Sequence, residues 1–139
     1  MDIKDLIPHR DPFLWVSDIL EHREGYIKTS AEFPDTLDFF NGHYPEHPIV
    51  PGVILCEACF QSGAAMISKQ MQANGNSFKG VPVLTRILGA KFKKEVLPND
   101  KVEIEVNHTE TLSSAWFMKA KMRINSKLAL SVEFAVMLT

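Results

Sequence analysis

Residues 42–61 read GHYPEHPIVPGVILCEACFQ, a loop with three prolines that leads directly into an apolar segment. Pro45, Pro48 and Pro51 each restrict one φ angle, so the loop is stiff and can hold a side chain in place. Pro51 also suits the first turn of a helix, because the N–H that proline lacks has no partner there. The sequence therefore predicts a rigid loop followed by a helix that begins near Pro51.

The segment after this loop is predicted to be one long buried helix. Nearly every residue from 53 to 67 is apolar or small, and a helix that is hydrophobic on all sides is typical of a protein interior. Asn74, Gly75 and Asn76 supply the stop signal, which predicts a length of about 30 Å. Such a helix must be covered by the rest of the chain and by a partner subunit.

The C-terminal part, residues 81–139, is predicted to form antiparallel strands. Apolar and polar residues alternate over 102–106, 116–124 and 128–138, which is the period of a strand with one buried face. Turn signals lie at 98–100, 112–114 and 125–126, and short turns imply antiparallel pairing.

The N-terminal part is predicted to add two more strands, at residues 14–21 and 26–33. Short helical pieces are expected at 3–7, where Pro8 ends the helix, and at 35–40. One curved antiparallel sheet wrapped around one long helix is the simplest arrangement of these elements, so the predicted fold class is α+β.

The composition indicates one globular domain over residues 1–139. Hydrophobic residues make up 45% and charged residues 23%, and the net charge of -2 gives no case for nucleic acid or an anionic membrane surface as a partner. No signal peptide is visible, no apolar run approaches the roughly 20 residues that span a bilayer, and two cysteines do not make a disulfide framework. These features predict a cytoplasmic protein.

Glu57 is the first candidate functional residue, because it lies in the second turn of an otherwise apolar helix. A carboxylate near a helix start can simply interact with the helix dipole or be capped by backbone N–H groups. Gln61, however, follows one turn later on the same face. Two polar groups on one stripe suggest a small polar site in an apolar cavity, where desolvation favours the proton-donating form of Glu57.

His43 is the second candidate, since the stiff loop would hold its imidazole in place as a base. A lone loop histidine is more often a surface or packing residue. His43 and His47 are four residues apart, but that spacing brings two metal ligands to one face only on a helix. Pro45 and Pro48 make a helix implausible there, so no metal site is predicted.

Gly52 and the two cysteines each have a structural and a functional interpretation. Free N–H groups at the helix start beside Gly52 can stabilise an oxyanion, although Pro-Gly alone indicates only a turn. Cys56 and Cys59 form a C-x-x-C pattern, but they lie beyond the first turn in apolar surroundings. They are therefore predicted to be small core residues rather than a redox pair.

A cluster of basic residues precedes the 98–100 turn. Its charges can protect the edge of a sheet from pairing, or they can form a docking face for an acidic partner. The members are Arg86, Lys91, Lys93 and Lys94.

The run from His43 to Gly52, together with Glu57 and Gln61, closely resembles the signature of the FabZ-type β-hydroxyacyl-acyl-carrier-protein dehydratases. Residues 8–14, PHRDPFL, are similar to the opening segment of that family. Residues 91–100, KFKKEVLPND, are similar to its later hairpin region. The resemblance extends over most of the chain.

The resemblance implies a hot-dog fold, in which an antiparallel sheet wraps around a long helix and two subunits form a dimer; many members assemble as a trimer of dimers. It implies that His43 of one subunit faces Glu57 of the other. His43 would take the α-proton of the thioester, the Gly52 N–H would polarise the carbonyl, and Glu57 would protonate the departing β-hydroxyl. No cofactor is implied.

The resemblance also implies the ligands. The acyl chain would lie in an apolar tunnel beside the helix, with Val53, Phe60 and Gln61 as substrate-binding residues. Acyl carrier protein, which is acidic, would dock on the basic cluster defined above. Glu57 favours the FabZ type over the isomerising branch, which carries an aspartate there, so dehydration without isomerisation is expected.

Some residues depart from the family pattern. The hairpin region is rich in lysine and reads Pro98-Asn99-Asp100, and the only tyrosines are Tyr26 and Tyr44, so the back half has no tyrosine gate. These departures leave open a specialised dehydratase of the polyketide or polyene type. A hot-dog acyl thioesterase and a non-catalytic binder of acyl groups or carrier protein stay open as well, because fold does not determine function.

Overall fold

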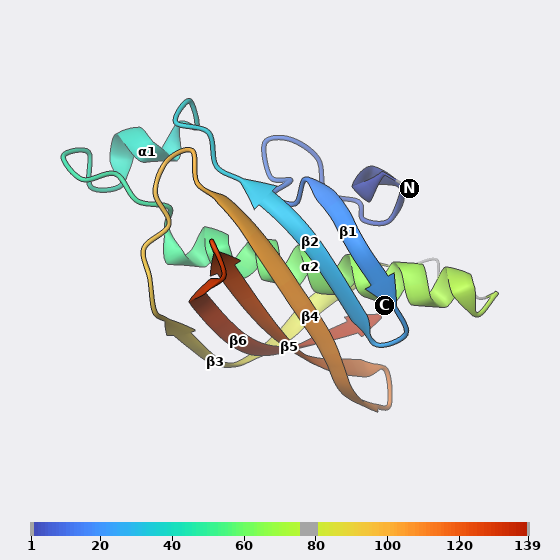
Figure 1. Cartoon of the computed structure of the whole chain (residues 1–139). Coiled ribbons are helices and arrows are strands. Elements are labelled where there is room, and N and C mark those ends of the chain that lie inside the picture. The colour runs from blue at the N-terminus through green and yellow to red at the C-terminus, as the bar shows by residue number, and fades with distance from the viewer. Residues whose placement is uncertain (1, 76–80, 139) are drawn as a thin grey trace.

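The computed structural model describes residues 2–75 and 81–138, and it shows one long helix lying against a curved sheet. The helix is α2 (Gly52–Ala73), and two short helical segments, η1 (Ile3–Asp5) and α1 (Phe39–Gly42), precede it. The strands of the sheet are β1 (Asp18–Arg23), β2 (Tyr26–Glu32), β3 (Pro82–Phe92), β4 (Lys101–Leu112), β5 (Ala115–Ile124) and β6 (Lys127–Leu138). Figure 1 shows this arrangement.

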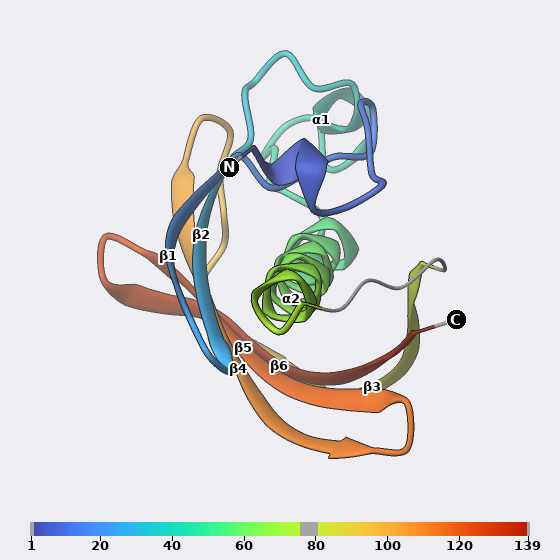
Figure 2. The ribbon, with the colours of Figure 1, turned by 90° about the vertical axis from the view of Figure 1, so that its right-hand side faces the viewer.

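All neighbouring strands of the sheet are antiparallel, in the order β1-β2-β4-β5-β6-β3. The chain forms the β1–β2 hairpin first, crosses the sheet as α2, and adds β3 at the opposite edge. Figure 2 looks along the helix and shows the sheet curving around it. This architecture confirms the predicted α+β class and the hot-dog arrangement.

Helix α2 begins and ends where the sequence predicts. Pro51 is the N-cap residue, with the helix starting at Gly52. At the other end the N–H of Asn74 donates to the O of Gln70 (3.1 Å), and Gly75 adopts a positive φ of 73°. This φ suits glycine, which has no Cβ to clash. Asn76 lies outside the described residues.

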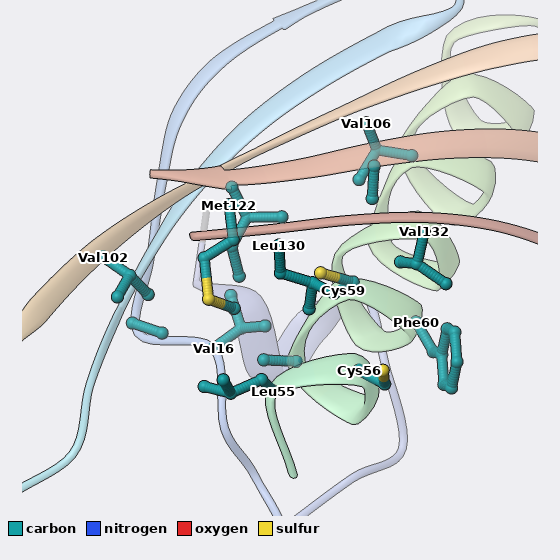
Figure 3. Close-up of a cluster of buried hydrophobic side chains, with 14 of the residues drawn as sticks. Val16, Leu55, Cys56, Cys59, Phe60, Val102, Val106, Met122, Leu130 and Val132 are labelled. Carbon is teal, nitrogen blue, oxygen red and sulfur yellow. The ribbon is translucent and has the colours of Figure 1, made fainter. Parts of the chain in front are cut away.

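The core lies between α2 and the concave face of the sheet. Figure 3 shows how apolar side chains from the helix meet those of the strands, among them Leu55 and Cys59 from α2 and Met122 and Leu130 from the sheet. The predicted alternation is confirmed in the strands, because Val102, Ile104, Val106, Met118, Ala120, Met122, Leu130, Val132, Phe134 and Val136 are all buried. No helix in the described ranges is both long and apolar enough to cross a membrane.

The first strand begins later than predicted, at Asp18 rather than at residue 14. The reason is that the N–H of Trp15 donates to Oε1 of Gln61 in α2 (2.9 Å). The backbone at residues 13 and 15 therefore bonds to the helix, and bonding to β2 begins only at Ser17, whose N–H donates to the O of Ser30 (2.8 Å). The helical turn expected at 35–40 is also displaced, since α1 covers Phe39–Gly42 and is preceded by a turn in which Leu37 N–H donates to the O of Pro34 (3.1 Å).

Strand β3 forms an exposed edge of the sheet. Every residue of this strand after Pro82 is exposed, and within the described chain β3 pairs only with β6. Its large exposed apolar residues are Val83, Leu84, Ile87, Leu88 and Phe92. A long apolar edge of this kind is typical of an interaction surface.

Candidate active site

Glu57 lies in a small hollow between α2, the N-terminal segment and the β3 edge. The hollow has a volume of about 100 Å³. Oε2 of Glu57 accepts a hydrogen bond from Nε2 of Gln61 (3.0 Å), and Nε2 of His9 lies 3.7 Å from the same oxygen. The Glu57 side chain is 23% exposed. The other residues that line the hollow are Phe60, Ala64, Pro82, Leu84 and Val136.

The side chain of Gln61 connects Glu57 to the N-terminal segment. Gln61 is fully buried. Its Oε1 accepts from the N–H of Trp15 (2.9 Å), and its Nε2 donates both to the O of Phe13 (2.9 Å) and to Glu57. Both hydrogens of the amide and its oxygen therefore have protein partners, so the amide orients Glu57 and anchors residues 13–15.

His9 is a site residue that sequence reasoning missed. Its side chain is 26% exposed and its Nε2 faces Glu57, whereas its Nδ1 is buried with no hydrogen-bond partner in the described chain. No spacing rule connects His9 to Glu57, because the contact is made by the tertiary fold. The only available signal was the position of His9 within the PHRDPFL segment.

His43 is held on the loop that follows α1. Its backbone N–H donates to the O of Phe39 (3.0 Å), and its Nδ1 lies 3.1 Å from the O of Ile49. A carbonyl oxygen can only accept, so Nδ1 carries the hydrogen and Nε2 carries the lone pair. The loop thus fixes the tautomer that a base requires.

His43 and Glu57 do not meet within one chain. In the described residues no hydrogen bond or ion pair joins them, and His43 is absent from the lining of the hollow at Glu57. The base and acid candidates are thus separate in the single subunit.

Gly52 lines a second hollow of about 340 Å³ at the start of α2. A Cβ on this residue would lie 3.0 Å from the ring of Phe92, so glycine permits the close approach of that ring. The first N–H groups of a helix have no partner within the helix. Lys93, Lys94 and Glu95 line the same hollow, which therefore combines a helix N-terminus with two cationic side chains and one carboxylate.

The other predicted site residues lie in different surroundings. Phe60 is buried and lines the hollow at Glu57, whereas Val53 is 76% exposed. The basic cluster is divided. Lys91 lines a third hollow, of about 410 Å³, together with Lys119 and Lys121, and Arg86 lies on the exposed β3 edge.

The residues considered as metal ligands or redox groups have other surroundings. Among the described residues, no group of three or more histidine, cysteine, aspartate or glutamate side chains is arranged to hold a metal ion. Nε2 of His47 lies 3.0 Å from Oε2 of Glu95. Cys56 and Cys59 are buried, and burial raises the pKa of both thiols. The prediction that they are core residues is confirmed.

Comparison with known proteins identifies the family of this chain. Residues 7–133 match the FabA-like domain family. A 3-hydroxyacyl-[acyl-carrier-protein] dehydratase FabZ from Clostridium perfringens is 37% identical over 134 residues, which cover 95% of this chain and 92% of that protein. The protein of the same name from Bacillus velezensis is 38% identical over 135 residues, which cover 94% of this chain and 91% of that protein.

The fold also matches a solved dehydratase. A chain of the dehydratase heterocomplex ApeI:P from Xenorhabdus doucetiae aligns with all of this chain and 91% of its own length, with a TM-score of 0.86 and 9% identity. At that identity the match concerns the fold alone. The family match over most of the sequence and the identity to the two FabZ proteins show that this chain belongs to the FabA-like family, as a hot-dog protein of the FabZ dehydratase type.

Proposed function

We propose that this protein removes water from a β-hydroxyacyl thioester carried on acyl carrier protein and releases the trans-2-enoyl thioester. The relatives that share more than a third of its residues are named as dehydratases of this substrate class. The observation that carries the proposal is Glu57, a carboxyl group held by Gln61 at the edge of an apolar core.

The reaction needs a base, an acid and a carbonyl donor. Nε2 of His43 takes the α-proton, because its Nδ1 is committed to Ile49. The electron pair of the broken C–H bond forms the double bond as the β C–O bond breaks. Glu57 donates its proton to the leaving hydroxyl, which departs as water, and the Gly52 N–H stabilises the charge that develops on the thioester oxygen.

The separation of His43 from Glu57 supports a site shared between two subunits. We propose a homodimer in which the exposed β3 edges of two copies meet, so that His43 of one copy faces Glu57 of the other. The long apolar edge is the surface that such a dimer would cover. Assembly of three dimers stays a further prediction.

The hollow at Gly52 is the proposed entrance for the thioester. Its lysines, Lys93 and Lys94, are exposed and can pair with an acidic carrier protein. Lys91 and Arg86 belong to the proposed docking face as the sequence predicted, but they do not line this hollow. Val53 and Phe60 are proposed to contact the acyl chain. Gln61 is proposed to act through Glu57, since its amide is fully occupied.

The decisive experiment is incubation with a β-hydroxyacyl carrier protein, followed by mass spectrometry of the acyl group. The wild type is expected to remove one water, and His43→Ala is expected to lower kcat by about 100-fold or more, as is usual for loss of a general base. His47→Ala is the matched control, because this histidine lies in the same loop but is exposed and paired with Glu95. It should keep wild-type turnover.

A thioesterase activity would give a different product. A thioesterase would release free thiol from an acyl-CoA, with the hydroxyl group retained. Release of thiol without loss of water would contradict the dehydratase proposal, and so would full dehydratase activity in His43→Ala. Binding of carrier protein without turnover of any chain length would instead support a non-catalytic binder.

A further inference from the structure

We propose that His9 is a positioning residue that acts through Glu57: with Gln61 it holds one carboxylate oxygen, so that the acid proton resides on the other. This inference rests on the proposed function, because it assigns a task to the acid of that reaction. It makes the N-terminal segment part of the catalytic machinery, although the segment precedes the sheet and lies far from Glu57 in sequence.

The orientation of the Gln61 amide is determined by its backbone partners. The N–H of Trp15 can only donate, so the atom that faces it must be the amide oxygen. The O of Phe13 can only accept, so the atom that faces it must be the amide nitrogen. The second hydrogen of that nitrogen then points at Oε2 of Glu57.

The amide consequently distinguishes the two oxygens of Glu57. Oε2 must act as an acceptor towards Gln61, so a proton on the carboxylic acid is favoured on Oε1. In the described chain Oε1 has no hydrogen-bond partner, whereas Oε2 faces both Gln61 and His9. Oε1 is therefore the oxygen available to the leaving hydroxyl.

A hydrogen on Nε2 of His9 would further favour placing the Glu57 proton on Oε1 rather than on Oε2. Nε2 lies 3.7 Å from Oε2 of Glu57, within ion-pair range and beyond a normal hydrogen bond. The proposed hydrogen bond therefore requires Nε2 and Oε2 to come closer together during the reaction than they are in the structure. A donor at this position opposes protonation of Oε2. The oxygen has two lone pairs in the carboxyl plane, and these cannot accept from both Gln61 and His9 while one of them also binds a proton. The segment that carries His9 is anchored nearby by the bonds of residues 13 and 15 to Gln61.

Kinetics of three proteins test the proposal. His9→Leu removes the donor while keeping bulk, and we expect kcat to fall about 10- to 100-fold, the effect of losing one hydrogen bond to a charged group. KM should stay within about twofold, since the proposed role of His9 acts on Glu57 and not on the substrate. His9→Gln places an amide N–H near the position of Nε2 and should recover most of kcat.

The kinetic results distinguish a positioning role of His9 from a role in substrate binding and from a purely structural role. An unchanged kcat in His9→Leu overturns the proposal. A raised KM with normal kcat overturns it in favour of substrate binding. An equal loss in His9→Leu and His9→Gln, together with a lower Tm in both, overturns it in favour of a purely structural role.

A second measurement does not depend on turnover. Nitrogen-15 NMR of the histidine rings, with the His9 signals assigned by their loss in His9→Leu, reports which ring nitrogen carries hydrogen. We expect a protonated Nε2 in the wild type and a changed His9 signal in Glu57→Gln. A hydrogen on Nδ1 alone overturns the inference. If the wild type dehydrates no thioester, the proposed function fails, while the NMR result still shows whether His9 donates to Glu57.

Discussion

Backbone groups determine the hydrogen-bonding orientation of two side chains at the candidate site. The O of Ile49 selects the tautomer of His43, and the N–H of Trp15 with the O of Phe13 selects the orientation of Gln61. Backbone groups cannot change from donor to acceptor, so they are reliable references for a side chain that can. These backbone groups therefore define which atoms of His43 and Gln61 donate a hydrogen bond and which accept one.

Tyr26 should make the free energy of unfolding depend on pH in the alkaline range. Burial, together with its hydrogen bond to Oε2 of Glu105 (2.8 Å), raises the pKa of Tyr26 to about 12 from the usual 10.0. Between these values the folded protein keeps the proton while the unfolded chain loses it. The free energy of unfolding should therefore be unaffected by this group below pH 10.0 and fall as the pH approaches about 12.

Urea unfolding across this alkaline range, compared with Tyr26→Phe, measures the effect. The wild-type free energy of unfolding should decline more steeply than that of the variant, because phenylalanine has no proton to lose. The comparison removes the contribution of lysines, which titrate in both proteins. Parallel curves would show that the environment of Tyr26 does not favour its protonated form.

At the scale of elements, the contact between α2 and the sheet depends on small residues on the helix. Gly63 faces Phe134 of β6, and Oγ of Ser62 shares a buried hydrogen bond with Oγ1 of Thr29 in β2 (2.8 Å). These residues let the helix approach the concave face closely. The depth at which α2 lies in turn determines where Glu57 stands relative to β3.

Gly63→Ala should destabilise the fold. A Cβ there would lie 2.9 Å from Cζ of Phe134 and 3.1 Å from Cε of Met118, and both side chains are buried. We expect the free energy of unfolding to fall by about 1–3 kcal/mol, the range for overpacking a core. Chemical denaturation checks this value.

Gly42→Ala is the matched control, since a Cβ at Gly42 in α1 meets nothing within 4 Å. Its effect should stay below about 1 kcal/mol. Equal destabilisation by both variants would show that the close packing at Gly63 is not the cause.

At the scale of the whole molecule, the sheet ends in an apolar strand and the two catalytic candidates lie apart. One proposed arrangement accounts for both features, namely a dimer through β3. Pairing of edges would cover the apolar side chains and satisfy the free backbone groups of the strand. It would also bring a second copy of the loop with His43 towards the hollow at Glu57.

Ile87→Lys should convert the proposed dimer to a monomer. Ile87 lies in β3 and is 55% exposed, and a lysine there would bury an unpaired charge in the interface. Leu112→Lys is the control, since Leu112 is 56% exposed but ends β4. Sedimentation velocity should show a dimer, or the proposed assembly of three dimers, for the wild type and the control, and a monomer for Ile87→Lys. A dimeric Ile87→Lys protein would exclude this surface as the interface.

A shared site also predicts complementation between inactive variants. His43→Ala and Glu57→Gln should each be inactive alone. After the two are unfolded and refolded together, half of the dimers are mixed and each has one intact site, so roughly a quarter of wild-type activity should return. No recovery in mixed dimers confirmed by mass spectrometry would place both residues in one subunit.

Much of the architecture was predictable because it depends on local patterns. Pro51 and Gly75 mark the ends of α2, and the alternation in β4, β5 and β6 identifies the buried face. The start of β1 was predicted wrongly, since the backbone of residues 13 and 15 bonds to Gln61 of α2 and no local signal separates that from pairing in a sheet. The contact between His9 and Glu57 was not predicted either, because it joins residues that are distant in sequence and no local pattern connects them.

By itself the sequence determined the elements, their order, the family and the residues His43, Gly52 and Glu57 as candidates, because periodicity, proline geometry and motif are properties of neighbouring residues. Only the tertiary structure decided which groups meet. It placed His9 and Gln61 on one oxygen of Glu57, divided the basic residues between separate hollows, and kept His43 away from Glu57 within one chain. These contacts join residues distant in sequence, and they depend on how the sheet curves around the helix.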